Sequence, residues 1–465
     1  MVISASEHVS EELIRQFSVP DPRYTSYPTI DRFVEAFAAD DYSQALKLRR
    51  IGAAVFAKPL SLYVHIPFCE SLCYYCTNNK VITRNHGRAA PYLQYLSREV
   101  DLHTAQLGSG QAVSQLHLGG GTPTFLSDDE LRELMGMLRQ SFTFSSKGEY
   151  TIEIDPRIDD LARLATLSEL GFNRLSFAVQ DFDPAVQKAV HRVQTAEKIA
   201  SLVHAARQQG FGAIHIDLIY GLPRQTPESF NDTLAQVIAF RPERIALNAY
   251  AHLPERFKPQ RKIDVADLPS TTVKAAMLSG AIASLKSAGY VGVGMDQFAL
   301  STDSLAIAKR QGRLHRNFQG YCAQSDCDRI GLGVSALGRM GATYSQNAKN
   351  IDEYFDLIDQ GVFPVVRGLG LSRDDLVRRA VIMSLMCHGE ILFESIELAH
   401  LLVFANYFEA EIEALKLLAD QGLVTLDNSG IQVTGAGWVL VCEVAMVFDR
   451  YLQTDRTRAR YSKII

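Results

Sequence analysis

Three of the seven cysteines lie close together, at Cys69, Cys73 and Cys76. The spacing C-x3-C-x2-C puts three thiolates on one short loop, which can wrap an iron–sulfur cube and leave one iron without a protein ligand. An open coordination position is where a small molecule can bind a metal and react. The alternatives are a structural zinc site or inert buried thiols. Structural zinc takes four ligands, usually as two CxxC-like pairs, and no fourth ligand lies nearby in the sequence.

A glycine-rich segment at residues 119–124, Gly-Gly-Gly-Thr-Pro-Thr, is the second candidate for chemistry. Glycines let a backbone approach a ligand closely and expose N–H groups to a carboxylate. The segment lacks the last glycine of the dinucleotide fingerprint and the lysine of a phosphate-binding loop. By itself it indicates no more than a tight turn.

Short runs of β-branched and aromatic residues alternate with amphipathic stretches through the first half of the chain. The predicted strands are residues 61–68, 114–119, 150–155, 174–180, 213–220 and 244–250. The predicted helices between them are residues 90–103, 128–140, 195–209 and 228–238. This alternation predicts βα units and a parallel sheet. Helix starts are indicated by Ser127 before three acidic residues and by Pro227 in a first turn.

Polar or reactive residues end nearly every predicted strand. They are Cys69, Gly120, Gly121, Thr122, Glu153, Gln180 and Asp217. Chemistry gathered from the carboxyl ends of many strands is typical of a barrel, whereas an open doubly wound sheet concentrates it at one crevice. We therefore expect an α/β fold with an incomplete (β/α)6-type barrel.

The chain is expected to have four parts. They are an N-terminal arm (1–58), the partial barrel (59–300), a barrel extension and connection (301–371), and a mainly helical C-terminal domain (372–465). Within the last part, residues 422–434 predict a β-hairpin after a helix, which resembles a winged helix. Nine Lys and Arg against thirteen Asp and Glu in residues 372–465 argue against DNA reading there. The basic tail of Arg456, Arg458, Arg460 and Lys463 indicates a solvated end.

Composition indicates a soluble globular protein, with 465 residues, 47% hydrophobic and 21% charged. A net charge of -5 argues against sequence-independent nucleic-acid binding. The first residues, with Glu7, Glu11 and Glu12, lack the apolar core of a secretory leader, and no window approaches the ~18 apolar residues of a membrane span. Sparse cysteines in an odd number favour a reducing, cytoplasmic setting.

The cysteine motif on the loop after the first strand resembles the signature of the radical S-adenosylmethionine (SAM) superfamily. The resemblance implies a [4Fe-4S] cluster whose open iron binds SAM. It also implies that an electron from the cluster cleaves SAM to methionine and a 5′-deoxyadenosyl radical. The protein would orient the radical toward its substrate and exclude water. The glycines at 119–121 match the superfamily's contact with the SAM amino group.

Seven further motifs narrow the resemblance to the family of oxygen-independent coproporphyrinogen III oxidases (dehydrogenases). They lie at residues 23–28, 63–68, 152–157, 172–176, 179–181, 216–223 and 315–321. The match runs nearly end to end. It implies anaerobic oxidative decarboxylation of coproporphyrinogen III to protoporphyrinogen IX in haem biosynthesis. The expected partners are a tetrapyrrole substrate and an electron donor, and the protein is expected to be a monomer.

The resemblance also implies roles for individual residues. Cys69, Cys73 and Cys76 would hold the cluster. The SAM on the cluster would be lined by Tyr63, Gly120, Glu153, Ala251 and Leu337. A second SAM molecule would contact Tyr75, Gly121, Thr122, Gln180, Arg192 and Asp217. The propionates of the substrate need cations, for which the candidates are Arg23, Arg261, Lys262 and Arg316.

The sequence departs from the family pattern where substrate handling is expected. The family's further cysteine two residues after Cys76 is Asn78, and the histidine of Gly-Met-Asp-His-Phe is Gln297. Ala249 stands for an asparagine, and Cys322 for a threonine. The three cluster cysteines are unchanged. Two alternatives therefore stay open, namely a diverged paralogue acting on another tetrapyrrole and a haem-binding chaperone without decarboxylase activity.

Overall fold

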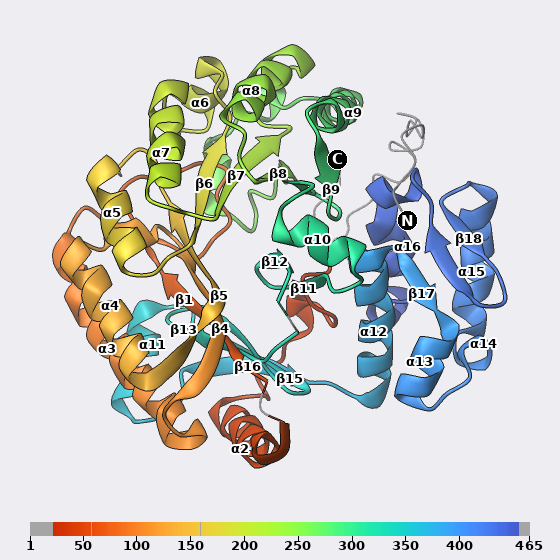
Figure 1. Ribbon diagram of the computed structural model, residues 1–465, viewed down its shortest axis with the longest axis horizontal. Helices are drawn as coiled ribbons and strands as arrows, with labels where there is room; N and C mark the ends of the chain where they lie inside the picture. The colour runs from red at the N-terminus through yellow and green to blue at the C-terminus, as the bar shows by residue number, and fades with distance from the viewer. Residues whose placement is uncertain (1–21, 57, 159, 325, 455–465) are drawn as a thin grey trace.

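The computed structural model describes residues 22–56, 58–158, 160–324 and 326–454 (Figure 1). In this part of the chain a twelve-stranded sheet has the order β16-β15-β14-β13-β1-β4-β5-β6-β7-β8-β10-β9. Its middle strands are β1 (Leu60–Ile66), β4 (Gln111–Gly120), β5 (Phe142–Ile154), β6 (Arg174–Gln180), β7 (Ala213–Tyr220) and β8 (Arg244–Ala249). All neighbours from β1 to β8 pair in parallel. The expected incomplete α/β barrel is confirmed.

The predictions for the two chain ends fall outside these residues. Glu7, Glu11 and Glu12 and the basic tail of Arg456, Arg458, Arg460 and Lys463 are not among the described residues. Within the described ranges, the helices are all too short or too polar to cross a membrane. The division of the chain at residues 58, 300 and 371 stays a prediction.

The two faces of β1 have different surroundings. Leu62, Val64 and Ile66 are fully buried in the main hydrophobic core. Successive side chains of a strand point to opposite faces, so the alternate residues Tyr63 and His65 lie on the other face. That inner face carries the polar residues of the barrel, while the apolar face packs against the surrounding helices.

The helices that cover the outer face begin close to where the sequence predicts them (Figure 1). The predicted ones are α3 (Ala89–Leu107), α4 (Asp128–Ser141), α7 (Ala196–Gln208) and α8 (Pro227–Phe240). α5 (Leu161–Glu169) lies in the same layer, at residues where no helix is predicted. Ser127 caps α4 through a capping box, in which its Oγ accepts from Glu130 N and the Glu130 carboxylate accepts from Ser127 N. Thr226 caps α8 in the same way, with Pro227 in the first turn.

Both edges of the sheet extend beyond the six parallel strands. Beside β1 lie β13 (Arg329–Leu332), β14 (Leu337–Met340), β15 (Thr343–Asn347) and β16 (Val365–Gly370), and beside β8 lie β10 (Gln297–Leu300) and β9 (Tyr290–Gly292). β13 is parallel to β1, whereas the others pair antiparallel to their neighbours. Residues 329–347 and 365–370 thus supply four regular strands, in a segment whose sequence pattern is irregular.

Further elements lie between these strands and helices. They are α2 (Ala39–Phe56), β2 (Phe68–Cys69), β3 (Val81–Ile82), α6 (Pro184–Ala189), α9 (Thr271–Ser287), α10 (Ser304–Arg310), β11 (His315–Asn317), β12 (Gly320–Cys322) and α11 (Ile351–Asp359). β11 and β12 form a separate antiparallel hairpin. Gln115 of β4 donates to Cys322 Sγ at 3.8 Å, so this hairpin contacts the inner face of the sheet.

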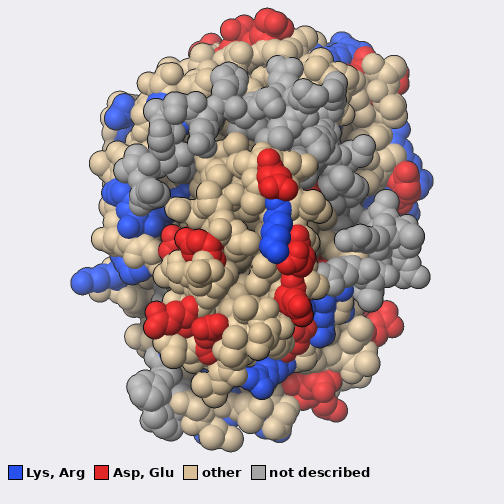
Figure 2. Space-filling model, turned by 90° about the vertical axis from the view of Figure 1, so that its right-hand side faces the viewer, with Lys and Arg blue, Asp and Glu red and all other residues tan. Residues whose placement is uncertain are grey.

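The C-terminal part is mainly helical and has its own core. It contains α12 (Arg373–His388), α13 (Phe393–His400), α14 (Phe404–Tyr407), α15 (Glu409–Asp420), α16 (Val441–Met446) and α17 (Arg450–Thr454). The predicted hairpin is confirmed as β18 (Val424–Leu426) and β19 (Gly430–Val433), with β17 (Glu390–Leu392) as a third strand. Figure 2 shows the face at the right of Figure 1, where acidic and basic side chains are interspersed.

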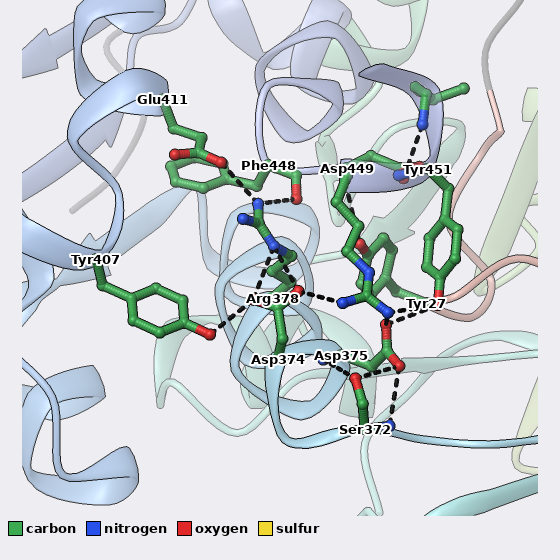
Figure 3. A network of polar contacts seen from close by, with 12 residues as sticks. Tyr27, Ser372, Asp374, Asp375, Arg378, Tyr407, Glu411, Phe448, Asp449 and Tyr451 are labelled. Atoms are coloured by element: carbon green, nitrogen blue, oxygen red, sulfur yellow. Dashed lines mark hydrogen bonds and ion pairs between the residues drawn. The ribbon is translucent and has the colours of Figure 1, made fainter. Parts of the chain in front are cut away.

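The N-terminal arm packs into the core of this C-terminal part. Tyr24 and Tyr27 are fully buried in it. Tyr24 Oη donates to Asp449 Oδ2 at 2.9 Å, and the Arg450 backbone N–H donates to Tyr27 Oη at 3.3 Å. Figure 3 shows the polar network around this contact, including the Arg378 guanidinium, which donates to the Glu411 carboxylate at 2.7 Å. Residues near the two ends of the described chain are therefore held together.

Candidate active site

The cysteine loop begins where β1 ends, at the carboxyl edge of the parallel strands. Thr122 Oγ1 donates to Cys69 Sγ at 3.4 Å, and Cys76 N donates to Cys73 O at 3.3 Å. Burial, offset in part by the Thr122 hydrogen bond and joined by the nearby thiols of Cys76 and Cys73, raises the pKa of the Cys69 thiol to about 11. The three sulfurs thus lie within electrostatic range of one another, as the spacing predicts.

The donor set fits an iron–sulfur cube. All three cysteines are free thiols, and they belong to one loop. Among the described residues, no three His, Cys, Asp or Glu side chains converge on a single-ion position. A cube places each thiolate on a different iron, so its ligands need a common loop rather than a common point.

The glycines at the end of β4 are required by close packing against the segment that leads to the cysteines. A Cβ on Gly121 would lie 2.5 Å from Pro67 O, and one on Gly120, whose φ is +111°, would lie 2.5 Å from the His65 ring. Gly121 N donates to Ile66 O and Thr122 N to Phe68 O, both at 2.9 Å. These two N–H groups donate within the protein, so a ligand contact of residues 121 and 122, which stays a prediction, would use other atoms.

Asn78 connects the cysteine loop to the same glycines. Its Nδ2 donates to Gly120 O at 2.8 Å. The neighbouring Asn79 carbonyl hydrogen-bonds His65 Nε2 at 2.9 Å, and His65 Nδ1 hydrogen-bonds Tyr63 Oη at 3.0 Å. The residue that departs from the family pattern therefore has a structural contact of its own.

A polar cluster on the inner face joins β1, β4 and β5. Glu153 Oε1 hydrogen-bonds His117 Nε2 at 2.9 Å, and Glu153 Oε2 accepts from Gly120 N at 3.3 Å. The Tyr63 ring lies 5.9 Å from the His117 ring. Sequence reasoning missed His65 and His117. The period-two alternation of β1 and β4 is the signal that would have found them, because each lies two residues from a residue already on the inner face.

Arg192 forms a second network next to Cys73. It is 5% exposed, and its Nη1 donates to Cys73 Sγ at 3.6 Å. Its Nη2 contacts Asp155 Oδ1 at 3.3 Å. Burial alone would lower the pKa of Arg192, but Tyr75, Asp155 and Cys73 raise it. Burial would raise the pKa of Asp155, but Arg192 and Arg157 lower it to about 2. The guanidinium is therefore charged, and it joins Cys73 of the cysteine loop to Asp155 after β5.

Gln180 and Asp217 end or interrupt the next two strands. Gln180 has a φ of +70°, and its buried Oε1 has no hydrogen-bond partner among the described residues. Asp217 accepts from Ser176 Oγ at 3.0 Å and hydrogen-bonds His215 Nε2 at 3.2 Å. Burial would raise the pKa of Asp217, but His215, Ser176 and His117 lower it. The strained backbone and the free amide oxygen at Gln180 are features of a ligand-facing residue.

The two apolar candidates lie at the border of the site. The Ala251 carbonyl accepts from Gln260 Nε2 at 3.0 Å, and the same amide donates to Tyr75 O at 3.2 Å. Leu337 begins β14 and pairs with Gln346 of β15. Its backbone approaches Gly331 so closely that a Cβ there would lie 2.6 Å from Leu337 O. Ala251 is thus tied to the cysteine loop, whereas Leu337 belongs to the neighbouring edge.

The four candidate cations do not form one group. Arg23 is ion-paired with Asp296, and Arg316 is buried and donates to Tyr24 O at 3.2 Å. Arg261 is exposed and donates to Pro254 O, and Lys262 Nζ lies 5.0 Å from the Tyr74 ring centroid. Arg23 lies on the N-terminal arm and Arg316, in β11, donates to that arm, while the other two lie on the segment after β8.

Comparisons with known proteins agree with this geometry. Residues 63–237 match the model of the Radical SAM superfamily, and residues 371–440 match the HemN C-terminal domain. The fold and the three-cysteine loop therefore define a radical SAM protein with a [4Fe-4S] cluster and SAM as its cofactors.

Relatives along the whole chain define the family. The chain is 49% identical to the oxygen-independent coproporphyrinogen III oxidase of Pseudomonas aeruginosa, covering 98% of both chains. It is 46% identical to that of Escherichia coli, over 97% of this chain and 98% of the relative. The solved structure of coproporphyrinogen III oxidase (HemN) from Escherichia coli, a radical SAM enzyme, has a TM-score of 0.88 at 47% identity and covers 92% of this chain and 97% of its own. The chain belongs to the family of oxygen-independent coproporphyrinogen III oxidases.

Proposed function

We propose that this protein converts coproporphyrinogen III to protoporphyrinogen IX without oxygen, in haem biosynthesis. In this reaction each of two propionates loses a β-hydrogen, CO2 and one electron and becomes a vinyl group. The observation that carries the proposal is the family membership, which spans 98% of both this chain and its Pseudomonas relative. When bound, the cluster and SAM supply a 5′-deoxyadenosyl radical for the hydrogen abstraction.

The residues of the site have separate tasks in this proposal. Cys69, Cys73 and Cys76 hold the cluster, each through a deprotonated thiol. Tyr63, Gly120, Glu153, Ala251 and Leu337 line the SAM on the cluster. Glu153 and the Gly120 carbonyl are acceptors suited to an amino group, and Asn78 orients that carbonyl by its hydrogen bond at 2.8 Å.

A second SAM site is proposed around Tyr75, Gly121, Thr122, Gln180, Arg192 and Asp217. Its support is the buried Gln180 Oε1, which has no partner within the described residues. An unpaired buried acceptor costs free energy unless a ligand donates to it. Arg192 carries a positive charge there and can bind a carboxylate, and Asp217 can accept from hydroxyl groups.

The remaining proposals concern surroundings and partners. We expect a separate electron donor to reduce the cluster, and we expect a monomer. All seven cysteines are free thiols, which supports a reducing, cytoplasmic setting. The sequence departures at Asn78 and Gln297 leave the cysteine loop complete, so they are expected to be tolerated.

An anaerobic assay tests the proposal. Purified protein with a reconstituted cluster is incubated with SAM, a strong reductant and coproporphyrinogen III. Mass spectrometry follows 5′-deoxyadenosine and the loss of two CO2 units from the tetrapyrrole. Formation of both products supports the proposed reaction. Cleavage of SAM while the tetrapyrrole keeps four propionates would favour a paralogue with another substrate. A cluster without either product, combined with stoichiometric haem binding, would favour the chaperone.

A further inference from the structure

An arginine-lined pocket lies between the N-terminal arm, the β11–β12 hairpin, the inner face of β13 and β14, and α12. Its lining includes Arg316, Arg329, Arg339 and Arg379, together with Asp326. Four guanidinium groups face one carboxylate, so the lining carries an excess of positive charge. The cluster and SAM sites described above do not account for this charge. Of the four arginines, only Arg316 is among the cations that the sequence analysis names for the propionates.

The existing contacts leave the excess charge unpaired. Asp326 is shared between Arg339 at 2.7 Å and Arg379 at 3.3 Å. Arg316 and Arg329 have only neutral acceptors within the described ranges: Arg316 donates to two backbone carbonyls of the arm, and Arg329 Nη2 donates to Gln319 Oε1 at 2.8 Å. They are 5% and 3% exposed, respectively. Two buried cations therefore lack an ion-pair partner in the part of the chain that the structure describes.

Several guanidinium nitrogens of the pocket also lack a hydrogen-bond acceptor among the described residues. Arg316 Nη1, Arg329 Nε and Arg339 Nε are buried and have no hydrogen-bond partner among the described residues. Buried guanidinium N–H groups are costly when unpaired, and a bound anion would satisfy them. Burial lowers the pKa of Arg329 to about 10, which is the response of a buried cation with no counter-ion.

The guanidinium groups are held in fixed positions rather than mobile. Arg316 lies over the Tyr321 ring at 4.5 Å, and Arg329 lies over the Phe318 ring at 5.6 Å. Both rings belong to the β11–β12 hairpin region, which contacts the inner face of the sheet. Planar guanidinium groups held by stacking and hydrogen bonds are suited to a planar carboxylate, because little side-chain entropy is lost on binding.

The pocket is electrostatically connected to the cysteine site through Tyr63. Arg329 starts β13, which pairs in parallel with β1, and Gly331 is opposite Tyr63 in the register. Burial raises the pKa of Tyr63, Glu153 raises it further, and Arg329 lowers it. Tyr63 therefore lies within electrostatic range of both Glu153 in the polar cluster and Arg329 of the pocket.

We propose that Arg316, Arg329 and Arg339 bind a propionate carboxylate of the substrate, and that this propionate is not the one being decarboxylated. The inference rests on the proposed function, in which the substrate has four propionates and two of them are retained. A carboxylate paired with several arginines is stabilised as an anion, which opposes its loss as CO2. The pocket is thus an anchor that holds the ring while another propionate reacts.

The test compares Arg329→Gln and Arg316→Gln with wild-type protein, in binding and in turnover. Binding of coproporphyrin III, the stable oxidised ring with the same carboxylates, is followed by fluorescence. Charge-assisted hydrogen bonds predict that each variant raises Kd about tenfold or more. In the anaerobic assay KM for coproporphyrinogen III should rise by a similar factor, with a smaller change in kcat. Arg132→Gln, on the exposed face of α4, is the matched control and should change neither.

Three further measurements distinguish a carboxylate site from a packing defect and from a SAM site. The charge-retaining Arg329→Lys should recover part of the affinity, whereas a packing defect alone would not be rescued by Lys. Binding of coproporphyrin III tetramethyl ester, which has no carboxylates, should be weak and equal in wild type and Arg329→Gln. Weaker SAM binding with unchanged coproporphyrin III binding would assign the pocket to the methionine carboxylate and overturn the proposal.

The two proposals can fail separately. If the wild-type protein releases no CO2 from coproporphyrinogen III, the proposed function is wrong. If wild type releases CO2 and both Gln variants keep the wild-type Kd and KM, the proposed function holds and the carboxylate anchor is wrong.

Discussion

Because Gly121 has no Cβ, the end of β4 and the segment that leads to the cysteine loop can lie close together. A Cβ there would lie 2.5 Å from Pro67 O and 2.9 Å from Ile66 O, which are both backbone atoms that cannot swing away. Gly121→Ala is expected to push the two segments apart and to lower the free energy of unfolding by about 1–3 kcal/mol. Urea unfolding measures this cost, and iron content after reconstitution shows whether the cluster loop is displaced.

Gly136→Ala is the control for that substitution. Gly136 lies inside α4, and a Cβ there meets no atom within 4 Å. Alanine is the better helix former, so this variant should be more stable than wild type by about 0.5–1 kcal/mol. Opposite signs for the two variants are expected. Equal stability of Gly121→Ala and wild type would show that the close approach is not required.

Asn78 provides the second prediction, at the position that departs from the family pattern. Asn78→Ala removes the hydrogen bond to Gly120 O and leaves the three cysteines in place. Iron content should stay unchanged, while the rate of SAM cleavage should fall about two- to fivefold, the effect of one neutral hydrogen bond. Thr77→Ala, at the preceding exposed position, is the control. A loss of iron in Asn78→Ala would mean instead that Asn78 is needed for the loop to form.

At the scale of elements, Glu99 connects α3 to the turn after β13. It is fully buried and accepts hydrogen bonds from Gly333 N, Asn347 Nδ2 and Tyr354 Oη, each at 2.7 Å. Burial nevertheless raises the pKa of Glu99 from about 4.5 to about 7. Between pH 4.5 and pH 7 Glu99 is therefore protonated in the folded protein but ionised in the unfolded chain. The free energy of unfolding consequently falls as the pH rises through this interval.

Glu99→Gln makes this contribution measurable. Glutamine does not titrate, so the stability of wild type relative to the variant should be larger at pH 5 than at pH 8. The full difference across the interval is about 3 kcal/mol. Urea unfolding of both proteins at the two pH values gives the comparison. A difference that stays constant or grows with pH would show that Glu99 is charged in the folded protein.

The elements differ in how well their sequence predicts them. β6 and β7 have the predicted limits, since apolar residues occur at every second position along each, at 175, 177 and 179 and at 214, 216 and 218. β13, β14 and β15 are four or five residues long. Runs this short carry too little pattern, and β13, which links β14 and β15 to the sheet, pairs with β1, a strand far away in the sequence. The cysteine spacing predicts the cluster loop, whereas the arginine pocket is assembled from four separate segments and has no motif.

At the scale of the whole molecule, the arm connects the two hydrophobic cores. Tyr24 and Tyr27 lie in the C-terminal core, while the Tyr344 hydroxyl of β15 donates to Tyr27 O at 3.2 Å. Arg316 donates to the carbonyls of Arg23 and Tyr24, so the same arm also closes one side of the arginine pocket. Docking of the C-terminal part and the shape of that pocket therefore depend on one segment of chain.

Tyr24→Phe tests this dependence. The substitution keeps the buried ring and removes the donor to Asp449 Oδ2, leaving a buried carboxylate with one hydrogen bond fewer. The expected cost is about 1–2 kcal/mol. The single tryptophan, Trp438, lies in the C-terminal part, so its fluorescence reports unfolding of that part during a urea titration. Tyr24→Phe should shift the fluorescence transition to lower urea.

Tyr407→Phe is the matched control for this prediction, because Tyr407 Oη also donates to an aspartate, Asp374, but belongs to no contact with the described part of the arm. Its side chain is partly exposed, and water can replace the lost donor, so its cost should stay below about 0.5 kcal/mol. Because the arm also closes one side of the arginine pocket, Tyr24→Phe should weaken coproporphyrin III binding as well, while Tyr407→Phe should not. If the two variants have the same free energy of unfolding and the same Kd for coproporphyrin III, the arm contributes to neither property. The C-terminal part would then dock through its own contacts alone.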